Sequence, residues 1–357
     1  MSLHEPTVDM PCPAGANYLP ARAGNAYRFW TDYDPEIIER DLSYARKLNV
    51  TSLRIPLSFH AWIKGAEAME ERLEHFLDTA EQARISVMPY LFEATGLEST
   101  RERRAETDPR RAVCLCEPGV AIINSPTGWN RPRGFVDWFM KRYANDLRLL
   151  AIDLVNEPDQ FSGGTEAGIV FARDMLQYAN RRRSGVSLTM GCADLRRNAF
   201  FLDVGIDVLQ WHMSFPDKPE RLKRCIVRGL RWQRILGKPV WLTEWQRLRP
   251  GGSGWTEGTV APGEDTPDYA SLATLVKRYP HGHFFYSLMV MPAYHLKQRA
   301  AGTISGVFHE DGAVWNLEDA RAISGDDSFD APERPQVPDW AEGAARSVRD
   351  MVQDEEG

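Results

Sequence analysis

Apolar positions along the chain fall into two alternating patterns. Short runs that are almost continuously apolar, such as 149–154 with Asp153 as its polar exception, are typical of strands buried on both faces of a parallel sheet. Longer segments, such as 35–48, repeat apolar residues at the spacing of an amphipathic helix. The first pattern predicts eight strands, at 15–20, 50–59, 85–93, 149–156, 187–192, 208–215, 238–246 and 283–290.

Predicted helices separate these strands, and no segment repeats at a fixed period. Such an alternation is typical of an α/β protein with a (β/α)8 TIM barrel. We therefore predict one barrel domain over residues 1–325, followed at 326–357 by an acidic, Pro-containing C-terminal tail with a short helix. Two connections, 94–134 and 246–268, are predicted to be irregular loops, the first a flap over the active-site mouth and the second a wall of the cleft.

Two carboxylates stand at the ends of predicted strands. Glu157 follows Asn156 and precedes Pro158, which cannot donate to a sheet ladder and so ends the strand. Glu244 stands near the end of the strand 238–246. Three strand-and-helix units of about 30 residues fit between the two, which assigns them to strands 4 and 7. Because barrel enzymes keep their chemistry at the carboxyl ends of the strands, we expect both carboxylates to face one cavity.

The motifs NEP at 156–158 and TEW at 243–245 resemble those of retaining glycoside hydrolases with (β/α)8 barrels, the clan of cellulases, β-mannanases and β-galactosidases that includes family 5. The resemblance implies that Glu157 is the general acid/base and Glu244 the nucleophile. It further implies that Asn156 donates to the sugar 2-hydroxyl. The expected activity is a retaining β-glycoside hydrolase that needs neither metal nor cofactor.

Three further residues are candidates for substrate binding. Arg54 lies inside the second predicted strand, where it either forms a salt bridge beneath the mouth or keeps the nucleophile ionised, as an Arg often does in that clan. His212 ends the sixth strand, where the clan also places a His, and is either a core residue or part of the site. Trp245 packs either in the barrel wall or beside the sugar.

Two positions depart from the clan's pattern. Many members have a Tyr two residues beyond the His of strand 6, and here that position is Ser214. Many also have a Trp at the end of strand 8, which this chain lacks. Either Tyr286 or Tyr294 is expected to replace it, and Tyr286 is our candidate for contact with the substrate. These departures leave the sugar and the linkage open.

Composition narrows the classes of partner. The net charge is −7, with Lys and Arg spread among Asp and Glu along the sequence, which argues against nucleic acid. The five Cys lack the paired spacing of a zinc site and are expected to be reduced. The first residues do not have the pattern of a secretory signal, and no apolar run has the length of a membrane span. We expect a cytoplasmic protein with a carbohydrate substrate and no membrane partner.

The sequence is compatible with several activities. Long loops favour a closed pocket and exo action on short β-linked oligosaccharides or glycosides, but an endo-acting β-glucanase or β-mannanase is also compatible with the motifs. A metal-dependent barrel enzyme resembling sugar isomerases would use Glu157, His212 and Glu244 as ligands, with Glu93 as a fourth. A sugar-binding barrel without turnover is disfavoured, because binding alone does not require both carboxylates.

Overall fold

The computed structural model describes residues 12–249 and 266–356. The first 11 residues, where the sequence predicts no secretory signal, lie outside the described residues. So does most of the predicted loop 246–268.

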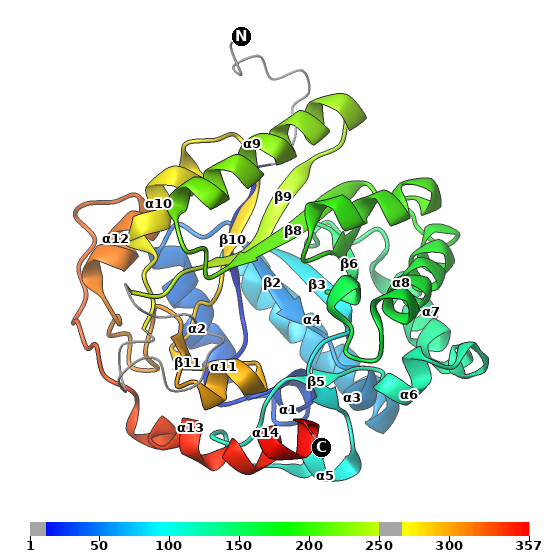
Figure 1. Cartoon of the computed structure of the whole chain (residues 1–357), viewed down its shortest axis with the longest axis horizontal. Coiled ribbons are helices and arrows are strands. Elements are labelled where there is room, and N and C mark those ends of the chain that lie inside the picture. The colour runs from blue at the N-terminus through cyan, green and yellow to red at the C-terminus, as the bar shows by residue number, and fades with distance from the viewer. Residues whose placement is uncertain (1–11, 250–265, 357) are drawn as a thin grey trace.

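Eight parallel strands close into a barrel in the order β1-β10-β9-β8-β7-β6-β3-β2, with helices around it (Figure 1). This confirms the predicted (β/α)8 architecture, whose active sites lie at the carboxyl ends of the strands. The barrel strands are β1 (Ala14–Asn17), β2 (Ser52–Pro56), β3 (Ser86–Glu93), β6 (Ile152–Asn156), β7 (Leu188–Gly191), β8 (Val208–Ser214), β9 (Val240–Gln246) and β10 (His283–Phe285).

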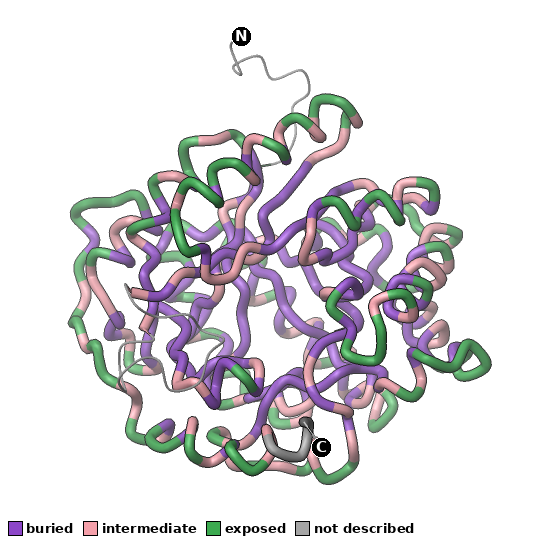
Figure 2. Tube along the Cα trace, in the orientation of Figure 1, coloured by how far each residue is buried: buried purple, intermediate pink, exposed green. Residues whose placement is uncertain are grey.

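The outer helices follow from local sequence signals. In α2 (Pro35–Lys47), the Asp34 side chain accepts a hydrogen bond from the backbone N–H of Glu36, while Ile38 and Leu42 are buried against the barrel. Buried positions accordingly lie on the inward sides of the helices and along the strands (Figure 2). The other main helices are α1 (Ala26–Thr31), α3 (Phe59–Lys64), α4 (Ala66–Gln82), α7 (Asn130–Tyr143), α8 (Thr165–Asn180), the 3₁₀ helix η3 (Leu195–Val204), α9 (Pro219–Leu236), α10 (Ala270–Lys277) and α12 (Leu317–Ser324).

The connection after β3 is more regular than the irregular loop predicted at 94–134. Its elements are β4 (Leu97–Glu98), α5 (Arg101–Ala105), β5 (Leu115–Cys116), α6 (Val120–Ile123) and the 3₁₀ helix η1 (Pro126–Gly128), and α7 already begins at Asn130. The segment is ordered by its own backbone, because β4 pairs with β5, and Glu93 and Glu117 exchange backbone hydrogen bonds of 3.1 and 2.8 Å.

The eighth barrel strand is shorter than predicted, since β10 ends at Phe285 rather than at residue 290. The peptide bond between Tyr286 and Ser287 is cis. Beyond it, β11 (Met291–Pro292) and β12 (Ile304–Ser305) form a separate antiparallel pair, with α11 (Leu296–Ala300) between them. The backbone N–H of Cys114 donates to the carbonyl of Tyr294 at 2.9 Å, which joins this segment to the connection after β3.

The C-terminal tail packs on these same segments. It contains the 3₁₀ helix η4 (Asp339–Ala341), α13 (Ala344–Ser347) and α14 (Arg349–Glu356), which lie close to α11 and α5 in Figure 1. Val348 is buried in an apolar cluster with Leu97, Leu115 and Leu296. The tail therefore covers the connection after β3.

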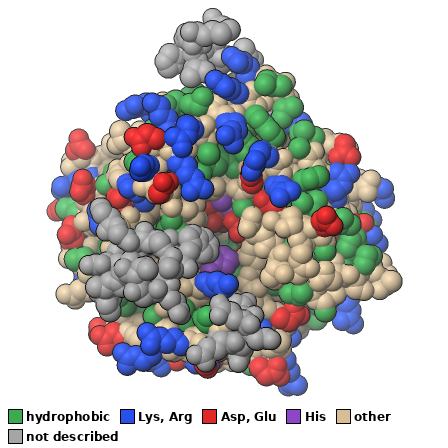
Figure 3. Space-filling model, in the orientation of Figure 1, with side chains coloured by type: hydrophobic (Ala, Val, Ile, Leu, Met, Phe, Trp, Pro, Cys, Tyr) green, Lys and Arg blue, Asp and Glu red, His purple; other side chains and the backbone are tan. Residues whose placement is uncertain are grey.

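Basic residues are less evenly distributed on the surface than along the sequence. Figure 3 shows Lys and Arg side chains gathered over α9. The exposed basic residues of that helix are Arg221, Lys223, Arg224, Arg228, Arg231 and Arg234.

Within the described part of the chain, no helix has the length and apolarity needed to cross a bilayer.

Candidate active site

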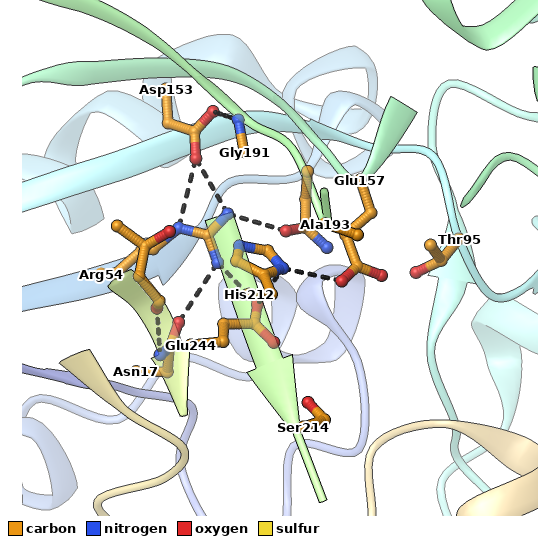
Figure 4. A network of polar contacts seen from close by, with 12 residues as sticks. Asn17, Arg54, Thr95, Asp153, Glu157, Gly191, Ala193, His212, Ser214 and Glu244 are labelled. Carbon is orange, nitrogen blue, oxygen red and sulfur yellow. Dashed lines mark hydrogen bonds and ion pairs between the residues drawn. The ribbon is translucent and has the colours of Figure 1, made fainter. Parts of the chain in front are cut away.

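The guanidinium of Arg54 in β2 is the centre of a buried polar network (Figure 4). Its Nη1 donates to Glu244 Oε1 at 2.8 Å and to Asn17 Oδ1 at 3.2 Å. Its Nη2 donates to Asp153 Oδ2 at 2.8 Å and to Asn156 Oδ1 at 2.7 Å. Because Arg54 is 1% exposed, these bonds form away from water, where charge-assisted hydrogen bonds are strong. One side chain thus ties β2 to β1, β6 and β9.

An irregularity in β6 lets two of its residues reach Arg54. Side chains alternate along a regular strand, so positions 153 and 156 would point to opposite faces. The register of β6 against β7 shifts between Asp153 and Asn156. This bulge brings both side chains to the same guanidinium.

A second bulge sets the direction of Glu244. β8 and β9 pair Trp211 with Leu242 and then His212 with Glu244, which leaves Thr243 as an extra residue on β9. The extra residue shifts by one position the alternation of side chains between the two faces of β9. As a result, Glu244 and His212 stand opposite each other on the face of the ladder that meets Arg54.

Gly191 at the end of β7 leaves room for this network. A Cβ at this position would lie 2.7 Å from Arg54 Nη2 and 2.9 Å from Asp153 Oδ2, closer than real Cβ contacts come. The backbone N–H of Gly191 also donates to Asp153 Oδ1 at 2.8 Å. A residue without a side chain is therefore required for Arg54 and Asp153 to meet here.

Glu157 follows β6 in the left-handed backbone region, with φ 47° and ψ 49°. This conformation is uncommon for a residue other than Gly and is concentrated at functional sites. The Glu157 N–H donates to the carbonyl of Gly191 at 2.7 Å, which holds the turn. Its carboxylate Oε1 lies 2.7 Å from Nδ1 of His212.

Glu157, His212 and Glu244 converge on one place. One oxygen of each carboxylate and one ring nitrogen of His212 lie within 4.8 Å of one another. The side chains of Glu157 and Glu244 are 17% and 12% exposed, whereas that of His212 is 3% exposed. Acidic and His side chains are visible at the centre of the face shown in Figure 3. The two carboxylates therefore reach solvent at a shared opening.

The two carboxyl groups have different electrostatic surroundings. Burial raises the pKa of Glu157 to about 7, with a further contribution from Asp159 and an opposing one from Arg54. Burial also raises the pKa of Glu244, but His212 and Arg54 oppose that shift. Arg54 donates a 2.8 Å hydrogen bond to Glu244, whereas Glu157 is hydrogen-bonded to His212. Ionisation is thus favoured at Glu244 relative to Glu157.

A third carboxyl group, that of Glu93, lies at the end of β3. Its Oε1 accepts hydrogen bonds from the backbone N–H and the Oγ1 of Thr95, at 3.0 and 2.6 Å. Nδ2 of Asn156 lies 3.0 Å from both carboxylate oxygens. Glu93 is 1% exposed, and burial raises its pKa to about 8 despite the Thr95 and Asn156 hydrogen bonds. Both of its oxygens thus act as acceptors for donors on Thr95 and Asn156.

Aromatic side chains border the network. The guanidinium carbon of Arg54 lies 4.6 Å from the centroid of the Tyr90 ring, a cation–π contact. A cavity beside Arg54 is lined by Tyr90, Tyr286 and Tyr294, among others. Tyr286 and Tyr294, the two candidates to replace the missing Trp of strand 8, therefore both border the same cavity as Arg54.

The structure brings most of the residues expected for the site together. Arg54 is hydrogen-bonded to Asn156 and Glu244, and His212 is hydrogen-bonded to Glu157 with its Nδ1 3.7 Å from Oε1 of Glu244. Their catalytic and binding roles stay predictions. At the position where the clan often has a Tyr, Ser214 Oγ accepts a hydrogen bond from Nε2 of Gln246 at 3.2 Å.

The expectation that Trp245 packs beside the sugar is wrong. Trp245 is 1% exposed and its ring packs edge-on against Tyr269 and Phe285, in the layer between barrel and helices. The physical reason is that neighbouring side chains of a strand point to opposite faces, so Trp245 points away from the face that carries Glu244. Its alternative reading, packing in the barrel wall, is the one observed.

Four residues of the network were missed as site residues. Asn17 and Asp153 are polar positions inside predicted strands, which was the signal that identified Arg54. Tyr90 and Gly191 gave no comparable signal, because Tyr is common in strands and Gly is common at strand ends. Their importance depends on contacts between strands that are distant in the sequence.

Glu157, His212 and Glu244 form the one cluster of potential metal ligands found among the described residues. The predicted fourth ligand, Glu93, is not part of this cluster, and its oxygens accept hydrogen bonds from Thr95 and Asn156. Carboxylate and imidazole ligands suit divalent cations. However, Arg54 places a permanent positive charge 2.8 Å from Glu244 Oε1, which disfavours a cation at that oxygen.

No model of a protein family matches the chain. No curated protein matches it either.

Solved structures do share the architecture. A variant of GH5_18 from Streptomyces cattleya in complex with Manb1-4GlcNAc has a TM-score of 0.62 at 16% identity, over 94% of this chain and 88% of that one. A glycoside hydrolase family 5 mannosidase from Rhizomucor miehei has a TM-score of 0.61 at 12% identity, over 89% and 92%. The endo-1,4-β-D-mannanase from Thermotoga petrophila RKU-1 has a TM-score of 0.53 at 14% identity, over 78% and 88%. The chain therefore has the same (β/α)8 fold as these mannanases and mannosidases.

Proposed function

We propose that the protein is a retaining β-glycoside hydrolase in which Glu157 is the acid/base and Glu244 the nucleophile. The asymmetry of the two carboxyl groups carries this proposal, because Arg54 donates to Glu244 while burial raises the pKa of Glu157 to about 7. A separation within 4.8 Å between one oxygen of each supports retention. Retaining enzymes place the two groups about 5–5.5 Å apart, against about 6.5–9.5 Å in inverting ones.

The reaction proceeds in two displacements. In the first, Glu244 attacks the anomeric carbon and forms an ester with it, while the glycosidic bond breaks and its oxygen takes the proton of Glu157. In the second, Glu157 takes a proton from water, whose oxygen attacks the anomeric carbon and releases Glu244. Arg54 keeps Glu244 ionised before the first step, and His212 lies within reach of both carboxylates.

The proposed substrates are short β-linked oligosaccharides or glycosides, cleaved from one end in the cytoplasm. Support for a closed pocket comes from the hydrogen bond between Cys114 and Tyr294, which joins two segments beside the site. The solved structures of the same fold include both a mannosidase and endo-mannanases, so β-mannosides are the first substrates to test. Endo action on a β-mannan or β-glucan is the alternative within this class.

The test is hydrolysis of aryl β-mannosides, β-glucosides and β-galactosides, with the product anomer followed by NMR. We expect the β-anomer to appear first, and we expect Glu244→Ala to lose at least about a thousandfold in kcat. Glu166→Gln, at an exposed position at the start of α8, is the control and should keep wild-type rates. Wild-type turnover by Glu244→Ala would refute the proposal, and an α-anomer as first product would refute retention.

A metal-dependent barrel enzyme is the second candidate, favoured by the convergence of Glu157, His212 and Glu244. The two candidates differ in their response to chelation. A glycosidase of the proposed kind keeps its activity in excess EDTA. Activity that is lost in EDTA and restored by Mn²⁺ or Mg²⁺ would instead favour the metal enzyme.

A further inference from the structure

The amide of Asn156 is held at both ends. Its Oδ1 accepts a hydrogen bond from Arg54 Nη2 at 2.7 Å, and its Nδ2 lies 3.0 Å from both oxygens of Glu93. Arg54 has only donors, and Glu93 presents acceptors at these contacts. A rotation of the amide by 180° would put donor against donor at Arg54 and acceptor against acceptor at Glu93. The two contacts therefore fix which end of the amide is which.

Glu93 is itself held in place by Thr95. The backbone N–H and the hydroxyl of Thr95 both donate to Oε1 of Glu93, at 3.0 and 2.6 Å. Glu93 is 1% exposed and Thr95 is 7% exposed, so these hydrogen bonds are buried at the end of β3. A chain of contacts thus runs from Thr95 through Glu93, Asn156 and Arg54 to Glu244.

One donor of Asn156 remains available. Because Nδ2 stands at equal distances from the two oxygens of Glu93, a single hydrogen shared between them satisfies this contact. The second hydrogen of Nδ2 then points away from Glu93. Asn156 immediately precedes Glu157, so this hydrogen belongs to the residue next to the proposed acid/base.

We propose that Glu93 is a positioning residue that holds the Asn156 amide with its N–H donor toward the bound sugar, so that this donor contacts the hydroxyl beside the anomeric carbon. The inference rests on the proposed function and extends it to a residue that does not itself touch substrate. It assigns Glu93 and Thr95 an effect on one substrate hydroxyl. Gluco and manno sugars differ in the configuration of that hydroxyl, so these residues bear on the choice between them.

Glu93→Gln is the most informative substitution, because it conserves volume and changes one acceptor into a donor. In one orientation the new amide group faces Nδ2 of Asn156, and in the other it faces the donors of Thr95. Either orientation sets a donor against a donor. Thr95→Val removes only the hydroxyl that supports Glu93 and serves as a milder second variant.

The experiment compares an aryl β-glycoside that carries the 2-hydroxyl with its 2-deoxy analogue. The 2-deoxy sugar is the same compound in the gluco and manno series. For the 2-hydroxy substrate, we expect kcat/KM to fall about 10- to 100-fold in Glu93→Gln, the effect of disturbing one strong hydrogen bond. For the 2-deoxy substrate the same variant should stay within about threefold of wild type, since the contact is missing there. Thr95→Val should show a smaller loss with the same selectivity.

Asp319→Asn is the matched control, because Asp319 is another buried carboxylate, 2% exposed, in α12. Asp319→Asn should leave the ratio of kcat/KM for the 2-hydroxy substrate to kcat/KM for the 2-deoxy substrate at the wild-type value. Equal losses on both substrates in Glu93→Gln would mean a purely structural role and would overturn the inference. If Glu93→Gln does not fold, the same kcat/KM ratio is measured in Thr95→Val, and a ratio equal to that of the wild type would overturn the inference. If the wild type hydrolyses neither substrate, the proposed function fails first, and this inference falls with it.

Discussion

His212 and Glu157 are joined by a hydrogen bond of 2.7 Å between Nδ1 and Oε1. The same nitrogen lies 3.7 Å from Oε1 of Glu244, so one imidazole stands between both proposed catalytic carboxylates. Burial lowers the pKa of His212, although Glu244 opposes the shift. The ring is therefore neutral at neutral pH. With its proton on Nδ1, it donates to an ionised carboxylate without adding a charge to the site.

This arrangement predicts the effect of His212→Phe on the pH profile. The variant loses the donor that stabilises ionised Glu157, so the pKa of Glu157 rises further and the alkaline limb of kcat/KM moves to higher pH. We also expect kcat/KM at the optimum to fall about 10- to 100-fold. His281→Phe, at a buried His outside the site, is the control. A limb that stays in place in His212→Phe would contradict the assignment.

The raised pKa of Glu157 predicts loss of activity at alkaline pH in the wild type. Glu157 donates a proton in the first step, and the protonated form disappears as pH rises through about 7. Glu157→Gln should lose about 100- to 10,000-fold in kcat/KM on a β-linked disaccharide. It should lose much less on a dinitrophenyl glycoside, whose leaving group needs no proton. A pH–rate series with both substrates checks this, and equal losses on the two would exclude Glu157 as the acid.

The space at Gly191 predicts the effect of Gly191→Ala. The added methyl would lie 2.7 Å from Arg54 Nη2 and would displace the guanidinium from Asp153 and Asn156. We expect kcat/KM to fall at least about tenfold, because small displacements in a catalytic site are costly. Gly65→Ala is the control, since the nearest atom to its new methyl lies at 3.8 Å, an ordinary contact. Wild-type activity in Gly191→Ala would show that the network tolerates a shift of Arg54.

The burial of the Arg54 network predicts a large effect on stability. Arg54→Met leaves the carboxylate of Asp153, 0% exposed, without its cation, and breaking a buried pair in this way costs about 3–5 kcal/mol. The exposed pair of Arg22 and Glu310 provides the comparison, and Arg22→Met should cost about 0–1 kcal/mol. Urea unfolding of both variants measures the difference. Similar losses for the two would mean that the buried pair contributes little.

Local signals explain how much of the fold could be predicted from sequence. The start of α2 can be read from Asp34 and Pro35, a side chain that caps a helix followed by a Pro at the first helical position. Glu157 and Glu244 could be identified because each follows an apolar strand at the position where barrels place their chemistry. In these cases the deciding interactions lie within a few residues along the chain.

The rest of the site depends on interactions between distant segments. The bulges at Thr243 and between Asp153 and Asn156 decide which side chains face Arg54. These strands are buried on both faces, so their sequences show no regular alternation from which a bulge could be recognised. The side to which Trp245 points could not be predicted either, because the bulge at Thr243 sets which residues of β9 face the barrel interior. Glu93 was considered only as a metal ligand, since its partners Thr95 and Asn156 come together only in the folded barrel.

The contacts of Arg54 also constrain the order of events during folding. Its hydrogen-bond partners come from β1, β6 and β9. The site is therefore complete only after the N-terminal and C-terminal halves of the chain have packed together. Asn17 adds to this dependence, because its Nδ2 donates to the carbonyls of Thr243 and Phe285 across the seam where the barrel closes. Neither half alone contains the nucleophile together with the cation that keeps it ionised. Catalytic competence should therefore return last during refolding, together with closure of the barrel.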